Sequence, residues 1–88
     1  MKINYQEWNA LRKAAAEFTD DPQYRTPSID VCVRKDTISM SVFIFTGSKC
    51  HMGADTNYKD SLVKRLRAAI TEVRGKAGLD ESDGTANG

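Results

Sequence analysis

The stretch Thr37–Thr46 alternates apolar and polar residues, and this alternation constrains the fold more than any other feature of the chain. Every second residue from Ile38 to Ile44 is apolar, which is the pattern of a β-strand with one face on a core. The other face begins with serines and ends with Phe43 and Phe45. A solvated sheet face has no structural need for two aromatic rings. We therefore expect these rings either to be covered by another segment or to bind a partner.

Size and composition indicate one small globular domain. A chain of 88 residues has room for a single modest core. Hydrophobic residues make up 40% and charged residues 28%, as in ordinary globular proteins, and a net charge of +1 favours no class of partner. No stretch approaches the roughly 20 apolar residues of a membrane span, and residues 1–3 lead into polar sequence. We expect a cytoplasmic protein with no membrane partner.

Capping signals predict a first helix near the amino terminus. Asn4 and Glu7 form a capping box, in which each side chain satisfies the other residue's backbone N–H, so the helix should begin at Tyr5. It should end at Asp20–Pro22, because a proline disfavours helical backbone at the residue before it. The apolar residues at helical spacing are Trp8, Leu11, Ala15 and Phe18, with Tyr5 and Ala14 beside them.

Turn signals predict an antiparallel meander. Residues 29–33 alternate as well, and a polar turn joins them to the central run, so all the aliphatic residues of both strands should share one face. Gly47-Ser48 fits a type II′ turn, with glycine at the position that needs a positive φ. This turn would fold residues 49–52 back as a short third strand. The predicted pairs are Val33–Ile38, Val31–Met40, Ile29–Val42, Phe45–Cys50 and Phe43–Met52.

A second helix and an acidic tail complete the predicted domain. An apolar stripe predicts a helix from about Tyr58 to Arg74, with Gly75 as its left-handed cap. Residues 79–88 are rich in glycine and acid, which predicts a disordered tail after a domain of residues 1–78. The expected fold class is α+β: a small single domain of order α-β-β-(β)-α, with a meander sheet and two helices on one face.

This order of elements resembles the topology of double-stranded-RNA-binding domains. That family carries a histidine in the loop between its first two strands and a lysine-rich start to its last helix. Here the loop is Arg34–Thr37, and the predicted helix opens Asn57-Tyr58-Lys59-Asp60-Ser61. The similarity is one of shape, and we infer no family membership from it.

The sequence contains no catalytic, metal or cofactor motif. Cys50 and His51 are the one adjacent nucleophile and base, but neighbours on a strand point to opposite faces and cannot act as a pair. One histidine and two separated cysteines do not supply the three or four ligands of a metal. Cys32 and Cys50 would lie about 20 Å apart along the sheet, which predicts free thiols. We expect a protein that is not an enzyme, with no cofactor and no small-molecule substrate.

Two surfaces remain as candidates for binding. The first is an apolar patch on the sheet, in which Cys50 joins the two rings, and which suits a partner protein or a second copy if the helices cover the other face. The second is one basic side of the last helix, which could meet phosphates or an acidic protein surface. The structural alternatives are covered rings and an ordinary solvated helix face. The candidate residues are Phe43, Phe45 and Met52 on the sheet and Lys64, Arg67 and Arg74 on the helix.

The expected function is therefore binding rather than catalysis. We expect a small module that docks on a protein partner, or on itself as a homodimer, as a regulator or an inhibitor. Compact chains without motifs are common among regulators and host-directed inhibitors of phage and other mobile elements. The alternative is a nucleic-acid-binding protein that uses Lys64, Arg65, Arg67 and Arg74.

Overall fold

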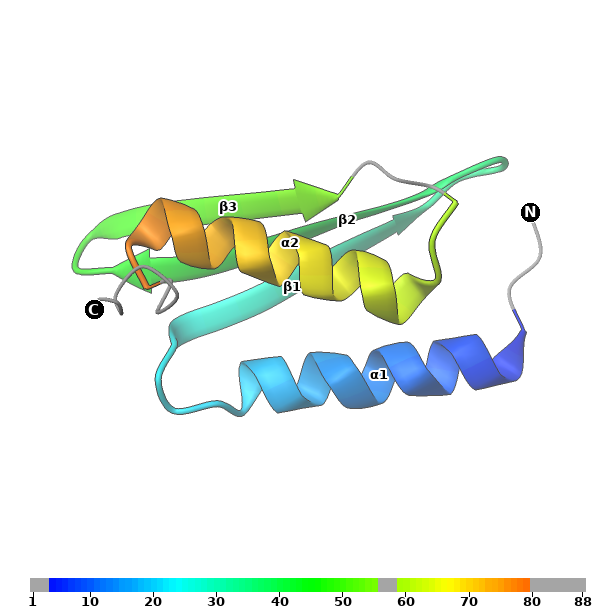
Figure 1. The fold of residues 1–88 in the computed structure, drawn as a ribbon, viewed down its shortest axis with the longest axis horizontal. Coiled ribbons are helices and arrows are strands. Elements are labelled where there is room, and N and C mark those ends of the chain that lie inside the picture. Colours follow the sequence, from blue (N-terminus) through cyan, green and yellow to red (C-terminus); the bar gives the residue numbers. More distant parts are fainter. Residues whose placement is uncertain (1–3, 56–58, 80–88) are drawn as a thin grey trace.

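The computed structural model describes residues 4–55 and 59–79, which form an antiparallel sheet with two helices on one of its faces (Figure 1). The strand β2 lies between β1 and β3. The predicted α+β class and element order are confirmed. No helix in the described ranges is long and apolar enough to cross a membrane. The elements are α1 (Tyr5–Thr19), β1 (Arg25–Val33), β2 (Ile38–Thr46), β3 (Lys49–Asp55) and α2 (Leu62–Ala77).

The predicted strand register is confirmed along both hairpins. Val33 pairs with Ile38 in the first hairpin, Phe45 pairs with Cys50 in the second, and the remaining predicted pairs are present as well. Gly47 has a φ of 63°, the left-handed backbone that the tight turn requires. The third strand is longer than predicted and continues to Asp55. Its added residues run beneath α2.

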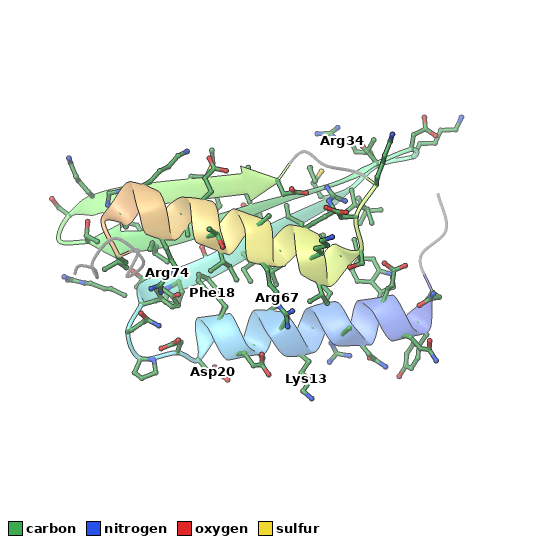
Figure 2. The ribbon with its side chains drawn as sticks, in the orientation of Figure 1. Lys13, Phe18, Asp20, Arg34, Arg67 and Arg74 are labelled. Atoms are coloured by element: carbon green, nitrogen blue, oxygen red, sulfur yellow. The ribbon has the colours of Figure 1, made fainter. Side chains whose placement is uncertain are left out.

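The core lies between the sheet and the helices. The even-numbered residues of β2 from Ile38 to Ile44 are fully buried and meet apolar side chains from both helices. Figure 2 shows Phe18 pointing from α1 toward α2, and its ring centroid lies 4.7 Å from that of Tyr24. The core residues are Leu11 and Phe18 from α1, Ile38, Met40, Val42 and Ile44 from β2, and Leu62, Leu66, Ala69 and Val73 from α2.

The second helix begins and ends later than the sequence predicted. Its described N-cap is Ser61, whose hydroxyl accepts a hydrogen bond from the first turn, so the helix begins at Leu62 and not near Tyr58, which itself lies outside the described residues. The left-handed C-cap is Gly78, with a φ of 75°, whereas Gly75 lies inside the helix. Several residues in each region could cap a helix, and tertiary packing selects among them.

Leu79, the first residue of the predicted tail, packs on the domain. Leu79 is partly buried against the core. Its N–H donates to the Arg74 carbonyl, and its own carbonyl accepts a hydrogen bond from the Arg74 guanidinium at 2.7 Å. The rest of the predicted tail, residues 80–88, lies outside the described residues.

The second half of β1 is more exposed than its register suggested. Val31 and Val33 share the face of Met40 and Ile38, but they are 38% and 59% exposed. The β1–β2 hairpin reaches past the start of α2, so its outer strand has no helix over it there (Figure 1). The aliphatic residues of β1 therefore share one face as predicted, but that face is not buried along the last part of the strand.

Truncations in the two layers should accordingly have unequal effects on stability. Leu66→Ala should lower the free energy of unfolding by about 2–4 kcal/mol, because Leu66 is fully buried in α2. Val31→Ala should cost clearly less, since much of its side chain is already in water. Urea denaturation of both variants measures the difference. Equal losses would contradict this assignment of buried and exposed faces.

Candidate partner-binding surface

The sheet face turned away from both helices is the candidate binding surface. Cross-strand partners share a face, so the register defines this surface. The buried core contains none of its residues. We call it the open face; it consists of Ser28, Asp30 and Cys32 from β1, Ser39, Ser41, Phe43 and Phe45 from β2, and Cys50, Met52 and Ala54 from β3.

The open face has one apolar end. Phe43 and Phe45 lie there on the central strand and are partly buried. Met52, opposite Phe43, is 45% exposed, and Cys50, opposite Phe45, is also exposed. We call these four residues the aromatic patch. The rest of the open face carries small residues and one aspartate.

The segment that joins α1 to β1 could have covered the rings of Phe43 and Phe45, but it lies on the helix side of the sheet. Tyr24 packs on Phe18 on the helix side of the sheet, and its hydroxyl accepts a hydrogen bond from Arg74 at 2.6 Å. The chain then enters β1 at Arg25, which is paired with Phe45 and exposed. Thus the two phenylalanines occupy the predicted face, where they are partly buried and neither described helix lies over them.

The basic residues of α2 do not form one free surface. Lys64 is exposed and lies 3.8 Å from Asp60. Arg67 points toward α1 (Figure 2), where it lines a shallow cavity of about 240 Å³ together with Glu17. Arg74 is hydrogen-bonded to other parts of the molecule. The three basic residues predicted to bind a partner therefore have three different environments.

Arg74 ties three segments of the chain together. Its guanidinium donates hydrogen bonds to the Tyr24 hydroxyl, to the Gln23 side chain and to the Leu79 carbonyl. The guanidinium carbon also lies 5.7 Å from the centre of the Tyr24 ring. Arg74 thus holds the α1–β1 connector against the end of α2, which makes its main role structural.

Arg65 is a core residue and not the surface cation that the nucleic-acid alternative assumed. It is 1% exposed. Its Nε lies 2.8 Å from Oδ2 of Asp55, and a second guanidinium nitrogen donates to the Ile38 carbonyl. Helical spacing could have revealed this position, because Arg65 follows Leu62 by three residues and precedes Ala69 by four, on the buried stripe.

The side chains that could take part in catalysis or metal binding are not assembled into a reactive site. Cys50 lies on the open face, whereas His51 lies on the helix side, where its Nε2 is 2.6 Å from the Thr46 hydroxyl. Within the described ranges, no cluster of three or more metal-ligating side chains is found. The pKa of Glu72 lies below its usual value because the side chains of Lys76 and Glu72 are hydrogen-bonded and the Ala54 N–H also donates to Glu72. This carboxylate links α2 to β3 and has no evident reactive role.

Comparisons with known proteins assign no family. No protein-family model matches the chain, and no curated protein or solved structure matches it either. The function must therefore be inferred from the surface itself.

Proposed function

We propose that this protein is a non-catalytic cytoplasmic binding module that docks its open face on a protein partner and so acts as a regulator or an inhibitor. The observation that supports this function is the aromatic patch on a sheet face that neither helix covers. Phenylalanine and methionine are enriched in the cores of protein interfaces, where they supply apolar contact area. A residue pair such as Phe43 and Met52 has no comparable use on a solvated sheet face.

The layout of the open face suits contact with a folded protein. The aromatic patch supplies an apolar centre at one end. The neighbouring serines and Ala54 are short, so a partner can approach the strands closely there. Arg25 and Asp30 are exposed beside these residues and offer polar contacts at the rim.

Nucleic acid is the alternative partner, and fewer residues support it. Of the four basic residues of α2 that this function would use, Arg65 is buried and Arg74 is bonded internally. Lys64 and Arg67 remain exposed. Phosphate binding by so few contacts gives weak, salt-sensitive affinity.

Phe45→Ser should abolish partner binding without unfolding the protein, because the ring lies outside the core between the sheet and the helices. Co-purification from a cell lysate measures binding, and urea denaturation measures the fold. The matched control is Tyr5→Ser, which removes an aromatic ring from α1 that is 77% exposed. We expect this control to bind as the unmodified protein does.

Nuclease and salt distinguish the two partner classes. Protein docking should survive nuclease treatment and change little between about 50 and 200 mM salt, since an apolar contact is not screened. Binding that is lost with nuclease, falls by about tenfold or more over this salt range and requires Arg67 would indicate nucleic acid instead. Loss of cooperative unfolding in Phe45→Ser would mean that the ring belongs to the core, and would contradict the proposal.

A further inference from the structure

The outer strand β1 has an edge with which no described strand pairs. It lies at the margin of the sheet, with β2 on one side and no described strand on the other. Val31, Cys32 and Val33 are all exposed. Pro27 and the irregularity at Thr26 protect the beginning of the strand, but residues 29–33 contain neither proline nor lysine. Such an edge presents free N–H and C=O groups to which another strand can bind.

One hydrogen bond in the hairpin shows which backbone groups point to the free edge. The Arg34 N–H donates to the Thr37 carbonyl at 2.8 Å, so Arg34 turns its backbone groups toward β2. Alternate residues of an antiparallel strand bond to the same neighbour, so the even-numbered residues of β1 also face β2. The residues with outward backbone groups are therefore Ile29, Val31 and Val33.

We propose that two copies of this protein pair through their β1 strands, antiparallel, about a two-fold axis at Cys32. In this register Val31 of one copy forms a hydrogen-bonded pair with Val33 of the second copy. Asp30 of one copy lies opposite Arg34 of the second, and the two Cys32 residues face each other on the axis. The two sheets then become one continuous sheet.

Charge complementarity selects this register from those that the backbone allows. Asp30 and Arg34 are both exposed, and neither has an ion-pair partner within the described chain. The proposed register joins them on each side of the axis. A register centred on Asp30 would oppose like charges, and one centred on Val31 would leave Asp30 opposite Cys32.

The exposed valines also favour a second copy of this chain as the partner of the β1 edge. Val31 and Val33 lie on the helix-side face but beyond the helix cover, where they are 38% and 59% exposed. Pairing brings the valines of both copies together in one apolar cluster. This cluster removes from water the part of the first hairpin that the monomer leaves uncovered.

This inference goes beyond the proposed function and does not depend on it. A paired β1 edge would place two open faces side by side in one sheet, with an aromatic patch in each copy. A partner with two equivalent sites would then be bound at both, which raises the apparent affinity through a high effective concentration.

Charge reversal tests the pairing. Sedimentation equilibrium of the full chain in reductant should show a monomer–dimer equilibrium. Asp30→Arg sets two arginines opposite each other and should weaken the dimer at least tenfold, and Arg34→Asp should do the same. The double variant that carries both changes restores opposite charges and should regain dimerisation. An unmodified chain that stays monomeric at all concentrations, or a double variant no better than the single ones, would overturn the proposal.

Cysteine cross-linking tests the axis. Residues facing each other in a non-hydrogen-bonded pair have Cα atoms about 4.5 Å apart, a distance that a disulfide spans. Oxidised glutathione should therefore link the two Cys32 sulfurs in a disulfide. It accepts both thiol protons and two electrons and becomes two molecules of reduced glutathione. Cys50→Ser should still give the linked dimer, and Cys32→Ser should not. Linkage through Cys50, or a dimer that dissociates in Phe45→Ser and not in the charge variants, would place the contact on the open face and overturn the β1 register.

Discussion

Gly53→Ala should destabilise this protein more than the same change at any other glycine of the described chain. A Cβ atom at Gly53 would lie 2.2 Å from the Ala69 carbonyl oxygen and 2.7 Å from the Val73 backbone nitrogen. Both are backbone atoms of α2, so neither can rotate away as the end of a flexible side chain can. The helix would have to lift from β3, and we expect a loss of roughly 3 kcal/mol or more.

The consequence for folding is large because a domain of this size has little stability to lose. Small domains are stable by about 5–10 kcal/mol. Circular dichroism during urea denaturation should show a midpoint shifted to much lower urea, or no folded baseline. The matched control is Gly75→Ala, in which the added methyl meets nothing within 4 Å inside α2. That change should stabilise the helix by about 0.5–1 kcal/mol. Equal behaviour of the two variants would show that α2 does not lie on β3 as described.

Arg65→Ala should also cause a large loss of stability. The substitution removes the cation that lies 2.8 Å from the Asp55 carboxylate and the donor that satisfies the Ile38 carbonyl. Truncating one partner of a buried ion pair costs about 3–5 kcal/mol, since the other charge stays desolvated. Thermal and urea unfolding of the variant measure the loss.

A double replacement by apolar residues separates the ion pair from mere packing. Arg65→Met combined with Asp55→Leu replaces both charges by apolar groups and should recover a large part of the loss. The exposed pair of Lys64 and Asp60 provides the control, because Lys64→Ala should cost less than about 1 kcal/mol. If Arg65→Ala were as mild as Lys64→Ala, the guanidinium would have to be solvated, contrary to its burial.

The register of the sheet could be predicted because one strand carries an unambiguous pattern. A shift of one residue in β2 would turn Val42 and Ile44 to solvent, so a single pairing satisfies both hairpins. Helix boundaries are less determined, since Gly75 and Gly78 can each adopt left-handed backbone and the packing of Leu79 decides between them. Local sequence does not contain that information.

The candidate surface was predictable in part. Strand phase placed Phe43 and Phe45 on the open face correctly, because it depends only on neighbours along the chain. Burial of the cations was not predicted, since it depends on where α2 crosses the sheet. That crossing brings Arg65 over Asp55 and Arg74 beside Tyr24, contacts between residues distant in sequence. The exposure of Val31 has the same origin, because it depends on how far the helices reach.

The alternation in β2 also separates the residues that stabilise the interior from the residues that form the open face. Its even-numbered residues from Ile38 to Ile44 fill the interior, whereas Ser39, Ser41, Phe43 and Phe45 make no contribution to the buried core. Substitutions at these outward positions can therefore change the open face while the interior stays the same. The strand is accordingly a suitable scaffold for a combinatorial library, in which four codons are randomised to obtain new specificities on an unaltered framework.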